Sequence, residues 1–324
     1  MIRRLLCAVS VLWLIPAFQA QAQNQPAWPN RPLRIIVPFA PGSFTDVAAR
    51  SLAAVLTTQI GQQVVVDNRS GAGGTIGTEM VAHAAPDGYT LLLSDNSFAV
   101  SAGLYTKLPY DPVKDFVQIS EIAEAPAMLV GRAELPAKTL KDLVELARAK
   151  PGQFNFGSGG QGSSAHLAME LFLSGAGVKM THVPLRGAAV AIAEVLAGHI
   201  DIAIASMSLG MPHVQSGRIQ GLAVTRKERS PLLPGVPTFA EAGFPQYDFT
   251  YWWGIAAPAA ISPQLAARLN REIAIAADNA KLKETFQSQG SRAVVSPTAN
   301  FTRRVVEEIK TWKKVIAETG VKVE

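Results

Sequence analysis

The chain has 324 residues, which favours two domains over one, and its composition of 48% hydrophobic and 17% charged residues allows sizeable cores and argues against disorder. Its 30 Lys and Arg residues against 25 Asp and Glu give a net charge of +5, but the basic residues are spread out and only 7% of the chain is aromatic, so no nucleic-acid partner is expected. The single cysteine excludes a disulfide scaffold and any cysteine-based zinc or iron–sulfur site.

The first 22 residues have the pattern of a secretory signal peptide. Arg3 and Arg4 precede an apolar run over 5–18, and Ala20 and Ala22 supply the small residues of a cleavage site. The run is shorter than the ~20 residues that a membrane-spanning helix needs, and an uncleaved anchor is the alternative. Cleavage after Ala22 would leave 324 − 22 = 302 residues, a charge of +5 − 2 = +3 and no cysteine. We therefore expect an exported, soluble protein without thiol chemistry.

A first series of strands and helices occupies residues 33–97. We predict strands at 33–37, 64–66 and 90–93, and helices at 47–60 and 75–84, the first of which ends at Gly61. The loops that follow the strands are predicted at 38–46, 68–74 and 94–97. The nearly continuous apolar character of the first strand is typical of a parallel sheet that is buried on both faces.

A second series begins after Asp115, where the stretch 116–130 is extended and apolar enough to cross between domains. We predict further strands at 154–156, 180–183, 201–205, 219–224 and 251–256. We predict helices from Thr139 to Pro151, from Ser163 or Ser164 onward, and at 188–196, 264–279 and 301–319. Pro-rich linkers at 230–237 and 258–263 flank the last strand.

Strands that alternate with helices predict an α/β fold with mainly parallel sheets and helices on both faces. Two such series predict two lobes joined by more than one strand. The predicted parts are a signal peptide at 1–22, the first part of lobe 1 at 23–124, lobe 2 at 125–224, and a return segment of lobe 1 with the hinge and the C-terminal helices at 225–324. In open parallel sheets ligands bind at the carboxyl ends of the strands, so we expect a site between the lobes.

Each predicted lobe has Gly-rich loops between a strand and a helix. They lie at 41–46 and 70–75 in the first lobe, and at 158–164 and 186–189 in the second. Each places free N–H groups and about half a positive charge at a helix start, worth ~0.3–2 kcal/mol toward an anion, and Ser or Thr adds hydroxyl donors. Together they predict a carboxylate site; the alternative is that they are ordinary connections of an α/β protein.

Several side chains near these loops have two possible roles. Asp46 is a candidate base or amine ligand, or only an acid that favours a helix start. Arg186 is a candidate partner of a ligand carboxylate, or a solvated surface residue. The Phe44 ring is expected to form a pocket wall. Trp252 and Trp253 are expected to pack in the core or hinge, with ligand stacking as the alternative.

The motifs of the common enzyme classes are absent from the sequence. A dinucleotide fingerprint fails where its third glycine would fall on Ile76, and there is no phosphate-binding P-loop or nucleophile elbow. The 5 histidines show no tight metal spacing, so neither a metal nor a cofactor is expected. A hydrolase that uses Ser163 or Ser164 with His166 is the main enzymatic alternative.

The chain resembles a known family over essentially its whole mature length. The matching stretches are Arg34-Ile35-Ile36-Val37-Pro38-Phe39-Ala40-Pro41-Gly42 with Thr45-Asp46, Val66-Asp67-Asn68-Arg69-Ser70-Gly71-Ala72-Gly73-Gly74, Ala85-Pro86-Asp87-Gly88-Tyr89-Thr90-Leu91, Leu108-Pro109-Tyr110-Asp111-Pro112, His182-Val183-Pro184 with Gly187, and Leu222-Ala223-Val224-Thr225 before Val236-Pro237-Thr238. In these stretches it is similar to the Bug (Bordetella uptake gene) proteins, the substrate-binding subunits of tripartite tricarboxylate transporters.

The resemblance implies a two-lobe periplasmic binding protein fold of the Venus-flytrap kind (type II) that closes on a small carboxylate. It also implies that loop backbone groups and ordered waters grip one carboxyl group of that ligand. We take as ligand-binding residues the positions that match the family's loops, together with Ser206: Gly42, Ser43, Phe44, Thr45, Asp46, Gly73, Gly74, Asn96, Ser97, Ser158, Gly159, Gly160, Gln161, Ser163, Ser164, Arg186, Gly187, Ala188 and Ser206.

The chain departs from the family's pattern in places that concern the ligand. Ser43 and Phe44 stand where the family usually has further glycine, which makes the first loop bulkier. Ser206 stands where an acidic residue is common, which puts an amine-recognising role there in doubt. Leu185 and Arg186 replace an aromatic–Lys pair, which keeps the charge but changes its geometry.

The predicted function is capture of a small di-, tri- or aromatic carboxylic acid in the periplasm by a monomeric, non-enzymatic receptor, with membrane permease subunits as transient partners. The alternatives are the secreted α/β hydrolase and a ligand-binding sensor that docks on a signalling protein. Phe44 favours an aromatic or longer apolar acid over citrate.

Overall fold

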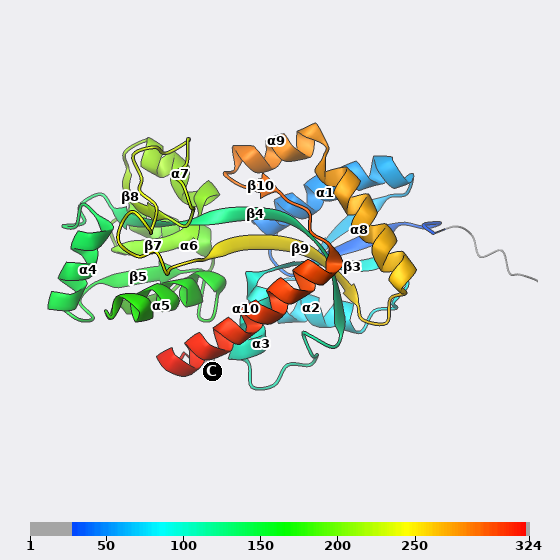
Figure 1. Ribbon diagram of the computed structural model, residues 1–324, viewed down its shortest axis with the longest axis horizontal. Coiled ribbons are helices and arrows are strands. Elements are labelled where there is room, and N and C mark those ends of the chain that lie inside the picture. The colour runs from blue at the N-terminus through cyan, green and yellow to red at the C-terminus, as the bar shows by residue number, and fades with distance from the viewer. Residues whose placement is uncertain (1–27, 322–324) are drawn as a thin grey trace, which may run out of the picture.

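A computed structural model describes residues 28–321, so the predicted signal peptide at 1–22 lies outside the described residues. The first series consists of β1 (Leu33–Val37), α1 (Phe44–Ile60), β2 (Val64–Asn68), the 3-10 turn η1 (Ala72–Gly74), α2 (Thr75–Ala82), β3 (Thr90–Asp95) and α3 (Asn96–Leu104). The long strand β4 (Phe116–Arg132) follows. Its residues join the first series to the second (Figure 1).

The second series and the return complete the chain. The second series consists of α4 (Leu140–Ala149), β5 (Asn155–Ser158), α5 (Ser164–Ala176), β6 (Thr181–Pro184), α6 (Ala188–Leu196), β7 (Ile202–Ser206), α7 (Met207–Gln215) and β8 (Ile219–Val224). The return consists of β9 (Thr250–Pro258), α8 (Pro263–Ala277), α9 (Ala280–Ser288), β10 (Arg292–Ala293) and α10 (Thr298–Thr319).

The strands form one continuous path in the order β2-β1-β3-β9-β4-β7-β5-β6. Within each lobe the strands are parallel, β1 with β2 and β3, and β5 with β6 and β7. The two crossing strands β4 and β9 pair antiparallel with each other and with their neighbours β7 and β3. Helices flank the two groups of strands, which confirms the predicted two-lobe α/β fold class (Figure 1).

The register makes the carboxyl ends of both parallel groups point at each other. Asp95 at the end of β3 lies opposite Trp253, which lies opposite Ala123 of β4. Ser206 at the end of β7 lies opposite Ala127, which also belongs to β4. Because three antiparallel pairings separate β3 from β7, these two strands run in opposite directions, toward one another. Their ends lie level with two residues of β4 that are 127 − 123 = 4 positions apart, which corresponds to about 13 Å at ~3.3 Å per residue.

Some predicted boundaries are wrong because a polar residue at a strand end also begins a helix. α1 starts at Phe44, three residues before the predicted start, since Ser43 caps it. The predicted loop 94–97 is instead the end of β3 followed at once by α3, which Asp95 caps. The helices α7 and α9 were not predicted.

The segment after residue 225 first packs on the second lobe. Phe239 and Tyr247 contact the ring of Phe172 in α5, and the Tyr247 hydroxyl donates to the Ala168 carbonyl at 2.9 Å. These contacts favour a lobe boundary later than the predicted one at residue 225, because the apolar side chains that follow pack around α5. We propose that the return to the first lobe begins with β9 at Thr250.

Candidate functional site

The helices α1 and α5 begin in the same way in the two lobes. Gly42 and Gly162 have left-handed φ values of 85° and 71°, a conformation that disfavours any side chain. Ser43 and Ser163 follow as N-caps with identical backbone angles, φ −67° and ψ 158°. Each hydroxyl oxygen accepts from the backbone N–H three residues on. The backbone N–H groups of the first two residues of each helix have no carbonyl partner within it, so each helix start presents N–H donors.

A side chain of each helix returns to the glycine and fixes the turn. The Gly42 N–H donates to Asp46 Oδ2 at 3.0 Å, and the Gly162 N–H donates to His166 Nδ1 at 3.0 Å. The residue four further on then pairs with that side chain, Arg50 with Asp46 in lobe 1 and Glu170 with His166 in lobe 2. The two lobes thus use one construction, in which a side chain at the third residue after the N-cap holds the glycine amide and contacts the residue four further on.

Asp46 is committed to this construction rather than free to act on a ligand. Besides the Gly42 amide, its carboxylate accepts from Arg50 Nε at 3.0 Å and from Asn68 Nδ2 at 2.9 Å. Burial opposes its ionisation, but the hydrogen bonds from Arg50, Gly42 and Asn68 outweigh burial and hold the pKa of Asp46 below its usual value. Of the two roles that the sequence left open, the structure supports the one at the helix start.

In lobe 1 a second acid, Asp95, lies beside these donors. Its Oδ1 accepts from the Ser97 amide at 2.9 Å, and its Oδ2 accepts from the Thr45 hydroxyl at 3.2 Å. Thr45 in turn accepts from Trp253 Nε1 at 3.0 Å. A small recess joins Asp95 to the predicted residues Gly73, Gly74 and Ser97; its other lining residues are Pro38, Phe39, Thr78, Ser94, Phe98 and Ser101.

In lobe 2 two histidines hold the loop that precedes α5. Ser158 is buried and its hydroxyl lies 2.7 Å from His182 Nε2. The His182 ring stacks on His166, with 3.7 Å between centroids, and on Phe156, with 4.9 Å. Burial, together with His166, lowers the pKa of His182 to about 3, so its imidazole stays neutral in the folded protein.

Replacing His182 by glutamine should make the protein more resistant to acid. In the unfolded chain a histidine titrates near 6.5, so between pH 6.5 and about 3 the unfolded state takes up a proton that the folded state does not. The neutral His182 therefore lowers the stability of the folded protein progressively as the pH falls below 6.5 and has no such effect above it. Urea unfolding at pH 7.5 and 4.5 should show the stability of the variant falling about 1–2 kcal/mol less than that of the wild type. Equal losses in the two proteins would contradict this account.

The remaining predicted residues of lobe 2 gather around the start of α6. A side chain at Gly159 would meet the Ala188 amide at 3.2 Å, so the loop before α5 lies directly against this helix start. Gly187 caps α6 with a φ of 118°, which disfavours any side chain. Arg186 is exposed, and no hydrogen bond or ion pair involves it among residues 28–321. Ser164 is the first residue of α5, and Gln161 is exposed before it.

Ser206 and Gly160 complete the predicted set. The Ser206 hydroxyl lies 2.7 Å from that of Ser208 at the start of α7. Gly160 has a φ of 130°, and its amide donates to the Ser158 hydroxyl oxygen at 3.2 Å. These contacts fix the turn after β5 and the start of α7 at the carboxyl ends of β5 and β7.

Asn96 does not present its side chain to the site, contrary to the prediction. Its Nδ2 donates to the Thr250 carbonyl at 3.1 Å and to Glu308 at 2.8 Å, and its Oδ1 accepts from the Trp252 amide at 3.0 Å. With 1% of its surface exposed, it joins α3 to β9 and α10 instead. The sequence suggested a loop residue, whereas the side chain satisfies buried backbone groups.

Phe44 also differs in part from its prediction. Its ring packs on Trp253, with 4.2 Å between centroids, and on Phe286 of α9, with 5.6 Å. It thus belongs to an aromatic cluster between α1, β9 and α9, and only its half-buried remainder is available to form a wall.

The serine–histidine pair of the hydrolase alternative is not formed. Ser163 accepts from the His166 backbone amide as an N-cap, while His166 Nδ1 accepts from Gly162. The imidazole that does face a serine hydroxyl is His182, but its partner Ser158 has 1% of its surface exposed. Sequence reasoning missed His182 and Asp95. The position of Asp95 in the predicted loop 94–97, directly after a predicted strand, is the available signal.

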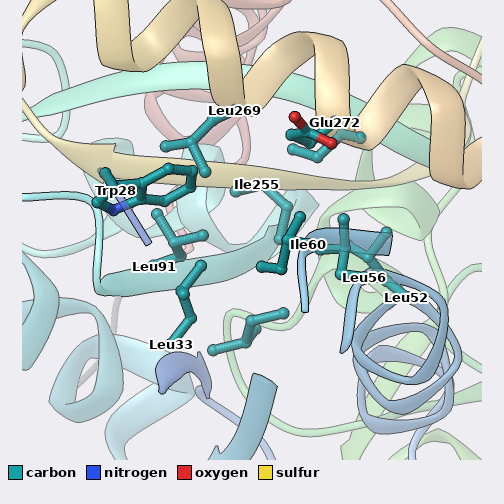
Figure 2. A pocket seen from close by; sticks show the side chains of 11 residues that line it. Trp28, Leu33, Leu52, Leu56, Ile60, Leu91, Ile255, Leu269 and Glu272 are labelled. Carbon is teal, nitrogen blue, oxygen red and sulfur yellow. The ribbon is translucent and has the colours of Figure 1, made fainter. Parts of the chain in front are cut away.

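A second small cavity lies at the opposite end of the first sheet. Leu33 and Leu91, near the beginnings of β1 and β3, line it together with Trp28, Leu56 and other apolar side chains (Figure 2). Glu272 is the charged residue in its lining. Its volume of about 10 Å³ is close to the minimum that holds one water molecule. Because its lining is otherwise apolar, we take it as a packing gap in the core.

The described part of the chain contains neither a metal-binding cluster nor a membrane-spanning helix. Between residues 28 and 321 no group of three or more His, Cys, Asp or Glu side chains is arranged to hold a metal ion. Within the same limits, no helix combines the length and the apolar character that crossing a membrane requires.

Comparisons with known proteins show the family and the fold of the chain. The model of the TctC family, described as the tripartite tricarboxylate transporter family receptor, matches residues 48–321. The chain is 37% identical to protein BugT of Bordetella pertussis, over 98% of each chain. It is 33% identical to R. palustris Rpa4515, solved with adipate, with a TM-score of 0.82 over 91% of this chain and 99% of that one. It is 30% identical to MatC from Rhodopseudomonas palustris, solved with bound malate, with a TM-score of 0.79 over 89% and 100%.

These likenesses span the whole described fold and confirm the resemblance to the Bug proteins. The family's members are receptors, and the two similar structures hold small carboxylates. The chain therefore belongs to the TctC family, the receptors of the tripartite tricarboxylate transporter family.

Proposed function

We propose that this protein is a periplasmic solute-binding protein that holds a small carboxylate between its two lobes for uptake by a tripartite transporter. The observation that carries the proposal is the pair of matched helix starts, Gly42–Ser43 before α1 and Gly162–Ser163 before α5. They follow β1 and β5, which run parallel to β3 and β7, the strands whose carboxyl ends approach the same stretch of β4. Donors from both lobes can then share one carboxylate, and a ligand that contacts both lobes stabilises the closed state.

The relatives support the ligand class and the partner. Similar proteins were solved with adipate and with malate, which makes a small di- or tricarboxylic or aromatic acid the ligand class to test. The family description names a tripartite transporter, so membrane permease subunits are the proposed transient partners of the closed form. Arg186, which is exposed and unpaired among the described residues, is the cation that we expect to move toward a bound carboxylate.

Replacing Ser43 by aspartate should weaken carboxylate binding about a hundredfold without unfolding the protein. Aspartate is as good an N-cap as serine, so the stability should stay within about 0.5 kcal/mol of the wild type. The negative charge of the new aspartate would lie beside the N–H groups of α1 that we propose bind the ligand carboxylate. Two like charges ~5 Å apart at an effective dielectric constant of 20 repel by about 3 kcal/mol, which predicts binding about a hundredfold weaker. Calorimetry of the mature chain against mono-, di-, tricarboxylic and aromatic acids first identifies an acid that binds.

The matched control is Thr139→Asp, which makes the same kind of change at the N-cap of α4, away from the predicted loops. It should bind the same acid with wild-type affinity. Wild-type affinity in the Ser43→Asp protein would exclude this helix start from the site. A wild-type protein that binds none of the acids would contradict the proposed function itself.

A further inference from the structure

Asp95 is an acid in a place where the proposed function calls for donors to an anion. It is the last residue of β3 and the N-cap of α3, and it lines the lobe 1 recess together with Gly73, Gly74 and Ser97. Most of its surface is covered. Its charge therefore meets any ligand group that enters this side of the site.

The hydrogen bonds around Asp95 fix it as an acceptor. Trp253 Nε1 donates to the Thr45 hydroxyl, and that hydroxyl donates to Asp95 Oδ2. The Ser97 amide donates to Oδ1. The Thr45 hydroxyl and the Ser97 amide both point at the carboxylate, which leaves its unused lone pairs to accept a further hydrogen bond.

No cation neutralises Asp95 among the described residues, whereas its neighbour Asp46 has Arg50 at 2.9 Å. The charged groups of α1 that face this region are that Asp46–Arg50 pair. On β9 the facing titratable group is Tyr251, and burial and the charge of Asp95 raise its pKa so that it stays a neutral phenol. Burial also raises the pKa of Asp95 itself to about 6, a further sign that its charge lacks a partner.

Two other titratable groups lie near the rim. Tyr105 donates to the Ala72 carbonyl at 3.2 Å beside Gly73. On α10, Glu308 faces the neighbouring Asn96 rather than the recess. Neither supplies a positive charge, so the ligand itself is the available source of a donor for Asp95.

We propose that Asp95 selects a carboxylic acid that also carries a hydrogen-bond donor, an ammonium or a hydroxyl group, directed at lobe 1. This inference rests on the proposed function. A ligand with a donor at that end satisfies the exposed lone pairs of the carboxylate, and an ammonium also pairs with its charge. A ligand with only carboxylates there would place an anion against an anion. Asp95 would then recognise the ligand amine, a role that Ser206 cannot fill because it carries no charge.

The test compares matched acids on the wild type and on Asp95→Asn. The sets are succinate, malate and aspartate, and glutarate, 2-hydroxyglutarate and glutamate, measured by calorimetry on the mature chain. The wild type should bind the hydroxy or amino acid of at least one set at least tenfold more tightly than the plain diacid. Asparagine keeps the N-cap but presents an amide donor. The variant should therefore reduce that preference at least tenfold, and thermal unfolding checks that it is folded.

The pH dependence gives a second, independent result. Lowering the pH from 7.5 to 5 protonates Asp95, so the wild type should lose about tenfold in affinity for the amino or hydroxy acid, whereas the variant should lose much less. An equal preference in the two proteins, or an equal loss of affinity in the two proteins at low pH, would overturn the proposal while leaving the receptor function intact. Failure of all acids, with both proteins folded, would instead overturn the receptor function.

Discussion

Replacing Glu308 by alanine should lower the free energy of unfolding by about 4 kcal/mol. The carboxylate of Glu308 on α10 accepts from the indole N–H groups of Trp252 and Trp312, and from Asn96 Nδ2 at 2.8 Å. Trp252 and Trp312 are buried, and so is Asn96. Without the carboxylate the two indole N–H groups have no acceptor and Asn96 Nδ2 keeps only the Thr250 carbonyl, and each unsatisfied buried donor costs about 1–3 kcal/mol.

Urea unfolding at neutral pH measures this loss, and Glu307→Ala is the matched control. Glu307 is the adjacent residue of the same helix and is exposed, so its replacement should change the stability by no more than about 0.5 kcal/mol. A loss of less than about 1 kcal/mol in the Glu308 variant would show that water or other groups replace the carboxylate. The predicted network would then not hold α10 to β9.

The same network explains which parts of the fold the sequence predicts. The strands β1 and β3 and the helices α4 and α6 follow from local patterns: apolar runs, a capping residue and a terminating Gly or Pro. The role of Asn96 does not, because its partner Glu308 lies 212 residues away in sequence. A polar residue after a strand looks the same whether it faces a ligand or satisfies a buried tryptophan.

The candidate site shows the same division. Ser43 and Ser163 are recognisable as helix starts because capping depends on neighbouring residues. The pairs Asp46–Arg50 and His166–Glu170 repeat after 166 − 46 = 120 residues, and each pair joins residues four apart, a spacing that is visible in the sequence. The pairing of Ser158 with His182 depends on the parallel register of β5 and β6, which no local pattern specifies.

Because Asp46 joins the loop to the helix, replacing it by alanine should weaken both the fold and ligand binding. The Gly42 amide and the Asn68 side chain would lose a charged acceptor, and hydrogen bonds to charged groups contribute about 1.5–3 kcal/mol each. The Arg50 side chain is half exposed and recovers its hydration, so the net loss of stability should be about 2 kcal/mol. The freed turn at 41–43 should no longer hold its donors in place, and affinity for the bound acid should fall at least tenfold.

Asp142→Ala separates the two effects, because Asp142 occupies the same position in α4, the third residue after the N-cap, and accepts from the Thr139 amide at 3.0 Å. Its loss should cost about 1 kcal/mol of stability through the helix start alone and leave the affinity unchanged. If the Asp46 variant loses stability but binds the acid as tightly as the wild type, the turn at Gly42 is a structural element only. If both variants lose affinity in proportion to stability, the binding loss reports general unfolding rather than the position of the loop. A loss of affinity confined to the Asp46 variant would place the turn in the ligand site, because a helix start matters to an anion only where the anion touches it.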